Sequence, residues 1–301
     1  MTNIKVSTGG FTPELWSDKI NINLDSYGAC NDIVSRKYEG EIKRKGDKVY
    51  FYTYGDLTVK DYDPTNSSFT GLEYEDPQGN KQALEVNQQK YIGFLVDDIQ
   101  DVQSNVDLVN GYTNRMSVAF ANTKDAYIHG LATAGAGTKL HDSSAITLTK
   151  DNVWAEVCTL EEKLAEKNAI TKNGLDYNGK RPALVVTPKF RSMLEQCSNF
   201  FANAFGEKVL RTGQIGRIGA FDVFLSTNIK TVTTGSDSSA TKSQTIVAIT
   251  SDAIMFADQI TKTETLRDVK QIGDYVRSLM VYGGVVANPN CIVTSKFAVT
   301  E

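Results

Sequence analysis

The sequence predicts an α+β fold, and three observations carry this prediction. A strand–turn–strand segment spans residues 38–91, and an amphipathic helix follows from Asp98 to about Leu131. The last part of the chain, residues 260–297, again shows the alternation of strands. Between these parts, residues 150–250 switch between helical and strand periodicity, which indicates a separate α/β unit.

Residues 1–39 precede these elements and are predicted to form an N-terminal arm. Thr12 and Pro13 are a suitable cap and first residue for a short helix, and Gly28 is suited to end it. An arm with so small an apolar face has little core of its own to join. We therefore expect it to be ordered by contact with other parts of an assembly.

Residues 38–91 are predicted to form an extended β-hairpin loop. The stretches VYFYTYGDLTV and ALEVNQQKYIGFLV are rich in β-branched and aromatic residues, which favour strands. Prolines, glycines and short polar residues typical of turns lie between them, from Asp61 to Gly79. A hairpin of this length cannot bury itself, so the segment indicates a protein that assembles with copies of itself rather than an enzyme.

The charges of this region are separated along the chain. Residues 36–48 hold six cations against three anions, and residues 56–85 hold seven anions against two cations. One interpretation is a solvated hairpin, and the other is a dipolar arm whose ends contact complementary patches on adjacent subunits. On the second interpretation the predicted intersubunit contacts are Arg36, Lys37, Lys43, Arg44, Lys45, Lys48, Asp61, Asp63, Glu73, Glu75 and Asp76.

The long helix is the strongest local prediction. From Ile99 to Leu131, apolar residues recur at steps of three or four, which gives the helix one continuous apolar stripe. At about 1.5 Å per residue it would be roughly 50 Å long. Asp97 or Asp98 is expected to cap its start, and the glycines from Gly130 onwards to end it. We expect the C-terminal strands to cover the stripe.

Local signals divide the later part of the chain into further elements. Residues 153–164 have helical spacing, ALVV at 183–186 is a short buried strand, and Thr187 and Pro188 begin another helix. Strands are predicted at 221–227 and 245–250, and in the tail DYVRSLMVYGG and CIVTSKFAV.

Composition excludes several classes of function. With a net charge of −4 over 301 residues, the chain as a whole is not expected to bind nucleic acid through a basic surface. It has no apolar run near 18 residues, so no membrane contact is expected. Four scattered cysteines without a CxxC pair, and only two histidines, predict neither a metal site nor a disulfide framework, and no cofactor is expected.

The remaining candidate motifs favour structural roles. Gly213, Gly216 and Gly219 have the spacing GxxGxxG and precede a strand, whereas a dinucleotide loop has GxGxxG before a helix. A flexible loop is the better interpretation. The adjacent Asp97 and Asp98 are better placed to cap a helix than to act together, and the phenylalanines at 200, 201 and 205 are expected in the core. No nucleophile–base or metal motif predicts an enzyme.

The order of the parts resembles the major capsid proteins of tailed double-stranded DNA phages, the Hong Kong 97-type fold. Four segments carry the resemblance, and together they span most of the chain: RKYEGEIKRKGDKVYFYTYGDLTVKDY, NQQKYIGFLVDDIQDVQ, ALVVTPKFRSML, and the tail from DYVRSLMVYGG to the Asn288–Pro289 pair. None is a sharp motif, since the family shares segment order more than residues. The resemblance implies an N-terminal arm (1–39), an extended loop (40–91), a peripheral domain with a spine helix (92–140 and 252–301) and an α/β axial domain (141–251).

The resemblance also implies a function and partners. The family builds hexamers and pentamers that close into an icosahedral shell around packaged double-stranded DNA, without sequence-specific DNA binding. The expected localisation is the virion, after assembly in the host cytoplasm. The further partners expected are a separate scaffolding protein, a portal and decoration proteins. Scaffolding is expected to be separate because some family members carry a fused N-terminal scaffolding segment, whereas this chain reaches its arm within a dozen residues. Some members also form cross-links between subunits, but no cross-linking residues can be matched here. An encapsulin-type nanocompartment shell with protein cargo is the alternative, and purified shells containing DNA or a cargo enzyme would separate the two.

Overall fold

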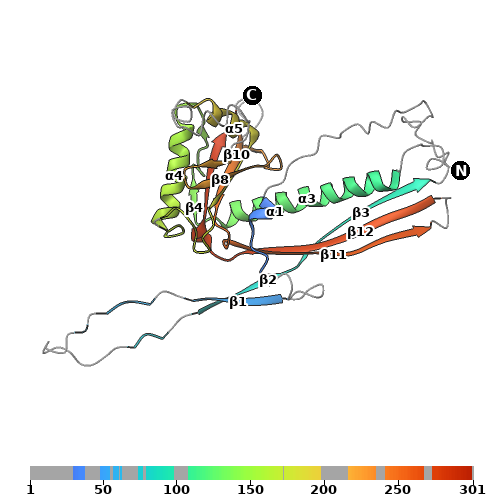
Figure 1. Cartoon of the computed structure of the whole chain (residues 1–301), viewed down its shortest axis with the longest axis horizontal. Helices are drawn as coiled ribbons and strands as arrows, with labels where there is room; N and C mark the ends of the chain where they lie inside the picture. The colour runs from blue at the N-terminus through green and yellow to red at the C-terminus, as the bar shows by residue number, and fades with distance from the viewer. Residues whose placement is uncertain are drawn as a thin grey trace.

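The computed structural model has three parts: a hairpin arm, a long sheet with a helix along it, and an α/β unit (Figure 1). The α/β unit stands at one end of the long sheet, and the hairpin projects as a thin separate arm. The structure describes residues 30–37, 48–54, 57–60, 62, 74–76, 79–97, 108–171, 173–197, 216–234, 241–267 and 273–299. The predicted helix of the arm, the first ten residues of the predicted spine helix and the phenylalanines at 200, 201 and 205 lie outside these ranges.

The helices and strands of the described chain follow one another in an order close to the one predicted. The helices are α1 (Cys30–Ile33), α3 (Leu108–Gly135), α4 (Val153–Glu166), α5 (Pro188–Glu195) and the 3-10 helix η3 (Pro289–Cys291). The strands are β1 (Lys48–Tyr54), β2 (Gly79–Glu85), β3 (Gln88–Asp97), β4 (Thr138–Leu140), β5 (Ile146–Thr147), β6 (Ala183–Val186), β7 (Arg217–Ile218), β8 (Phe221–Leu225), β9 (Val232–Thr234), β10 (Thr241–Ile249), β11 (Ile254–Arg267), β12 (Gly273–Val286) and β13 (Ile292–Ala298).

The long sheet has three antiparallel strands in the order β11–β12–β3. Along β12, residues alternate between buried and more exposed positions from Val276 to Met280. One face of the sheet therefore packs against α3, which runs along it in Figure 1. Asp97 is the last residue of β3, where it pairs with Gly273. That Asp97 or Asp98 caps the helix stays a prediction, because residues 98–107 are outside the described ones.

The described part of the spine helix, α3, has the predicted apolar stripe. Met116, Phe120 and Ile128 are buried against residues of β11 and β12, and also against β6 and β10 of the α/β unit. The expectation that the C-terminal strands cover the stripe is confirmed for this part of the helix. The helix continues through Gly130, where a side chain would meet nothing within 4 Å, and ends at Gly135, against which the Val286 side chain packs closely.

An eight-stranded mixed sheet forms the centre of the α/β unit. Its main path is β4–β13–β10–β6–β8–β7, with β5 beside β13 and β9 beside β10. Helices α4 and α5 bury their apolar sides on it in one core cluster. At the start of α5, the Thr187 hydroxyl accepts a hydrogen bond from the Phe190 N–H at 3.3 Å, so the predicted cap is confirmed.

The last strand lies in a different sheet from its predecessor. Residues 252–301 were assigned together to the peripheral domain, yet β13 pairs with β10 and β4 in the α/β unit, while β11 and β12 belong to the long sheet. The 3-10 turn after Asn288 makes this change of direction, and Asn288 Oδ1 accepts from the Asn290 N–H at 3.1 Å. The domain boundaries as such stay a prediction, but this pairing places β13 with the α/β unit.

The glycine-containing loop before β8 is a turn. Gly219 has a φ of 56° between β7 and β8, a conformation that glycine adopts without strain. A strand follows it, as predicted, and Gly213 is outside the described residues. Among the described helices, none combines the length and the apolar character that a membrane crossing requires.

Candidate assembly surfaces

The hairpin of β1 and β2 has one buried and one exposed face. The two strands are antiparallel and paired from Lys48–Glu85 to Tyr54–Gly79. Phe51 points to the buried side, whereas Tyr50 and Tyr52 point outwards and are 51% and 62% exposed. The Lys81 amine lies 3.9 Å from the centre of the Tyr50 ring, a cation–π contact on the exposed face. Two neighbouring exposed tyrosines on a projecting strand are typical of a surface that another molecule covers.

The chain beyond these strands carries more exposed apolar side chains. Leu57, Val59, Tyr62 and Tyr74 are all exposed, Val59 at 97% and Tyr74 at 88%. The Thr58 N–H donates to Glu75 Oε2 at 3.1 Å, which holds the outgoing and returning chains side by side. This hydrogen bond lowers the pKa of the Glu75 carboxyl. The described arm thus offers apolar and acidic groups without a core of its own.

The root of the hairpin is firmly attached to the body. Phe51, Leu84 and Val86 form a small core cluster with Ala257 of β11 and Val281 of β12. β2 crosses β12 where Gly283 lies against the backbone of Glu85, a contact that a larger residue would not permit. The arm therefore begins on a rigid sheet, and its direction is fixed there.

Five of the predicted contact residues are described: Arg36, Lys37, Lys48, Glu75 and Asp76. Arg36 Nη1 lies 3.0 Å from Asp258 Oδ1, and Lys37 Nζ lies 2.9 Å from Asp252 Oδ1. Lys48 Nζ lies 2.6 Å from Glu85 Oε1 across the hairpin, and this carboxylate raises the pKa of the Lys48 amine. Glu75 bonds to Thr58 as above and lies 3.9 Å from Lys60.

These ion pairs and hydrogen bonds therefore attach the start of the arm to the body and hold the outgoing and returning segments of the hairpin together. Asp76, the last of these five predicted contact residues, is exposed on the arm beside Glu75. The other predicted contacts, Lys43, Arg44, Lys45, Asp61, Asp63 and Glu73, lie outside the described residues. That any of these residues contacts another subunit stays a prediction.

A buried carboxylate that the sequence analysis missed joins three elements. Asp125 of α3 is 0% exposed. Its Oδ1 accepts from the Cys30 N–H of α1 at 2.6 Å, and its Oδ2 accepts from the Ser226 hydroxyl at 2.8 Å and from Asn228 Nδ2 at 3.0 Å. An aspartate among apolar positions of an amphipathic helix was the only sequence signal for it. Its bonds fix the end of the N-terminal arm and the turn after β8 onto the spine helix.

A second missed carboxylate organises the loop between α4 and β6. Asp176 accepts from the Ser251 hydroxyl at 2.5 Å and from the N–H groups of Asn178 and Lys180. Asn178 in turn donates to Asp252, the partner of Lys37. Burial would raise the pKa of Asp252, but the hydrogen bonds from Asn178 and Lys37 lower it overall. This network ties the loop to the turn before β11.

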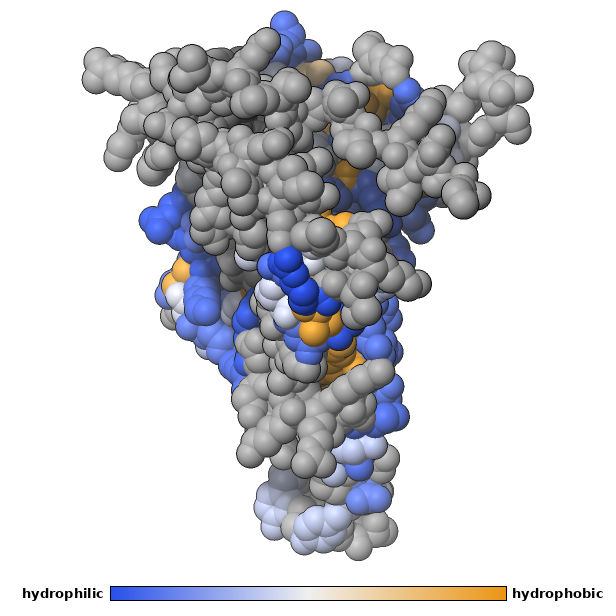
Figure 2. All heavy atoms as spheres, turned by 90° about the vertical axis from the view of Figure 1, so that its right-hand side faces the viewer, coloured by the Kyte–Doolittle hydropathy of each residue, from blue (hydrophilic) through white to orange (hydrophobic). Residues whose placement is uncertain are grey.

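The face of the long sheet away from α3 carries an exposed apolar row. Leu95, Tyr275 and Leu266 are adjacent across β3, β12 and β11 in the strand register, and each is about 40% exposed. The next row holds an ion pair, with Arg277 Nη2 2.6 Å from Glu264 Oε2. In the end-on view, apolar surface appears in a few separate places among polar side chains (Figure 2). The described surface therefore offers several small contact areas.

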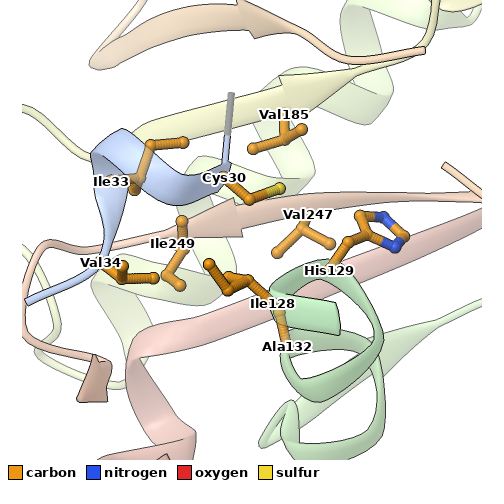
Figure 3. A pocket seen from close by; sticks show the side chains of 9 residues that line it. All are labelled: Cys30, Ile33, Val34, Ile128, His129, Ala132, Val185, Val247 and Ile249. Carbon is orange, nitrogen blue, oxygen red and sulfur yellow. The ribbon is translucent and has the colours of Figure 1, made fainter. Parts of the chain in front are cut away.

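A small cavity in the described part of the chain lies where several elements pack together. Its volume is about 10 Å³, near the least that holds a single water. Side chains of α1, α3 and two strands face one another around it (Figure 3): Cys30, Ile33, Val34, Ile128, His129, Ala132, Val185, Val247 and Ile249. Burial raises the pKa of the Cys30 thiol and lowers that of His129. No ligand of ordinary size fits here.

The described histidines bond to neighbouring parts of the fold. Among the described residues, no group of three histidine, cysteine or acidic side chains is placed to hold a metal ion. Of the described histidines, His129 bonds to the Thr245 carbonyl at 2.9 Å, and His141 lies 3.3 Å from the buried Glu156. These are contacts that stabilise the fold.

A comparison with protein families shows which family this chain belongs to. Residues 81–295, well over half of the chain, match the family model for the phage capsid protein. The chain belongs to the phage capsid protein family. The match begins in β2 and runs through the spine helix and the α/β unit to β13. This capsid protein is therefore a structural component of a bacteriophage virion shell.

Solved structures with the same fold cover nearly the whole chain. A chain of Mycobacterium phage Che8 is 24% identical, with a TM-score of 0.76 over 95% of this chain and 97% of that chain. The capsid of the cyanophage P-SCSP1u is 12% identical, with a TM-score of 0.73 over 95% and 93%. The capsid of a native GTA particle is 16% identical, with a TM-score of 0.61 over 97% and 98%. No curated protein sequence matches closely enough to count as a relative.

These matches bear directly on the expectations from the sequence. The α+β, Hong Kong 97-type capsid fold is confirmed, since phage capsids share the architecture along almost the full chain. The class of protein, a viral capsid component, is confirmed by the family match. These matches do not test the predicted intersubunit contacts of individual charged residues.

Proposed function

We propose that this capsid protein is the major capsid protein of a tailed phage, and that it assembles through hexamers and pentamers into an icosahedral shell around packaged double-stranded DNA. Its role is structural and not enzymatic. Assembly takes place in the cytoplasm of the bacterial host. Self-association is the property that the described surfaces support best.

The single observation that carries this proposal is the hairpin arm. Its root is buried on β11 and β12, while its outer face exposes Tyr50, Tyr52 and, further along, Tyr74. Apolar side chains in such positions are stabilised only when another surface covers them, at about 25 cal/mol per Å² of apolar area. In a closed shell of identical subunits, every arm has a neighbour to cover it.

The charge of the chain is consistent with a container for DNA. With a net charge of −4, the subunit as a whole does not attract phosphates, which suits a shell that encloses DNA without binding it tightly. We propose that it makes no sequence-specific contact with the packaged DNA. We propose as further partners a separate scaffolding protein, a portal and decoration proteins. The peripheral domain then consists of the spine helix with β3, β11 and β12, and the axial domain of the eight-stranded sheet with α4 and α5.

Expression of the protein and imaging of the purified material by negative-stain electron microscopy test this proposal. We expect closed shells of uniform diameter when the protein is concentrated or native. A compact monomer at every concentration, with no particle from any source, would contradict it. The nucleic acid content of particles purified from infected cells distinguishes a DNA-filled virion from an encapsulin-type compartment with protein cargo.

A further inference from the structure

The α/β unit has an open pocket that no described side chain fills. Its volume is about 380 Å³, in the range of pockets that bind a ligand or a large side chain. It lies between the loop before β6, the turn of β7 and β8, and the end of β10. Apolar side chains, among them Ile33, Phe224 and Ile249, line one part of it.

Cations line the other part of the pocket. Arg217 Nε pairs with Asp222 at 3.1 Å, and Arg181 Nη1 donates to the Gly219 carbonyl at 3.3 Å. Both guanidinium groups keep further donors, because each has five N–H groups. The Lys180 amine makes no ion pair or hydrogen bond to any described residue. Three cations against one carboxylate, beside apolar walls, suit an aromatic side chain flanked by anions.

The chain itself contains a segment with that chemistry. Tyr74 is 88% exposed on the hairpin arm and is followed by the exposed acidic residues Glu75 and Asp76. The root of the arm is fixed on β11 and β12, and the arm projects as a separate element (Figure 1). Tyr74 therefore has no aromatic or apolar cover from the described body of its own subunit, while it is available to a second copy.

We propose that the pocket at Lys180, Arg181 and Arg217 receives Tyr74, Glu75 and Asp76 from the hairpin arm of a second copy of this chain. The tyrosine ring packs against the apolar walls, and the carboxylates pair with the cations. The charges fix which segment docks and in which direction, while burial of the ring supplies most of the affinity. This inference rests on the proposed assembly into shells and names one contact within it.

Carbodiimide coupling in wild-type shells tests the contact directly. The reagent joins a lysine amine to a carboxylate that touches it, and mass spectrometry identifies the joined peptides. Shells are assembled from a mixture of ¹⁵N-labelled and unlabelled subunits. We expect Lys180 coupled to Glu75 or Asp76 in pairs of mixed isotope, which shows that two copies are joined. The Lys180→Arg variant keeps the charge and should lose this coupled peptide.

Two results overturn the inference. One is coupling of Lys180 only to other carboxylates, or no coupling in intact shells. The other is coupling without mixed-isotope pairs, which would place the contact within one chain. If the wild-type protein forms no shells at all, the proposed function fails and the inference fails with it. Shells without the coupling contradict the inference alone.

A charge exchange provides an independent test. Lys180→Glu and Glu75→Lys should each reduce the yield of shells, and the double variant should restore part of that yield. Circular dichroism of each variant shows whether the subunit is folded. A double variant that assembles no better than the worse single variant would contradict a contact between these two residues.

Discussion

Gly283 of β12 lies so close to Glu85 that a Cβ atom on Gly283 would be 2.0 Å from the Glu85 carbonyl oxygen. The obstructing atom belongs to the backbone of β2, so it cannot rotate away as a side chain would. The absence of a side chain at Gly283 is thus what allows the hairpin to cross the long sheet. This contact sets the position from which the arm begins.

Gly283→Ala should therefore displace the root of the hairpin and impair assembly. The α/β unit is remote from the contact and should stay folded. Negative-stain images should show few or irregular shells, while circular dichroism keeps its helical signal. Gly130→Ala is the matched control, because nothing lies within 4 Å of that position and alanine favours a helix by about 1 kcal/mol. Normal shells from Gly283→Ala would contradict this account of the root.

Shortening the hairpin should separate folding from assembly. Tyr54 and Gly79 are the last paired residues of β1 and β2, so replacing residues 55–78 by Asn-Gly would close the strands with a two-residue turn. We expect a folded subunit with an unchanged root that no longer forms closed shells. Size-exclusion chromatography and microscopy measure this. Closed shells of normal diameter would show that the distal arm is dispensable.

Phe120→Asp should prevent folding, and not assembly alone. Phe120 is 5% exposed between α3 and the sheets, and an unpaired carboxylate there costs several kcal/mol. That is a large share of a typical stability of roughly 5–15 kcal/mol. Ala119→Asp, at the exposed neighbouring position, is the control and should fold normally. A soluble and assembly-competent Phe120→Asp protein would mean that the stripe is not covered as described.

Asp125→Ala should loosen the attachment of α1 to the spine helix. It leaves the buried Cys30 N–H and the buried Ser226 hydroxyl without their acceptor and removes one of the bonds of the Asn228 amide. Each buried donor left unpaired costs about 1–3 kcal/mol. We expect the midpoint of thermal unfolding to fall by about 5 °C or more. Asn122→Ala, which removes a single bond of 3.2 Å to Asn228, should have a smaller effect. An equal fall in the unfolding midpoint for both variants would contradict the account in which Asp125 is the main link between these elements.

Reversal of the basic end of the loop tests the predicted charge contacts. Arg44→Glu with Lys45→Glu should slow or misdirect assembly if these residues contact acidic groups of an adjacent subunit. Raised salt should weaken the wild-type assembly as well, because exposed charges are screened beyond about 10 Å at 0.1 M. Light scattering follows both rates. If neither changes, these side chains only keep the loop soluble.

Local patterns in the sequence were sufficient for most of the elements. The strands of the hairpin, the Thr187 cap and the apolar stripe of α3 depend on neighbouring residues, and periodicity and capping chemistry describe such relationships well. The helix was predicted to end at about Leu131, and it ends at Gly135, one of the glycines expected to stop it. It continues through Gly130, because that position has open space around it and a glycine in a helix is tolerated at about 1 kcal/mol.

Contacts between distant residues could not be predicted in this way. The pairing of β13 with β10, the close approach of Gly283 to Glu85 and the bond from Cys30 to Asp125 join residues far apart in sequence. The same reason explains why the sequence did not indicate the carboxylates of the same chain that lie beside Arg36, Lys37 and Lys48. Sequence spacing shows that a charge exists but not which partner is nearest.

The central claim is that the hairpin arm is ordered by a neighbouring copy in a closed shell. A cryo-electron microscopy reconstruction of the purified particles tests it most directly. We predict an icosahedral shell in which the rings of Tyr50, Tyr52 and Tyr74 pack against another subunit. A shell in which these three side chains point into solvent, or a particle without subunit-to-subunit contact along the arm, would contradict the account.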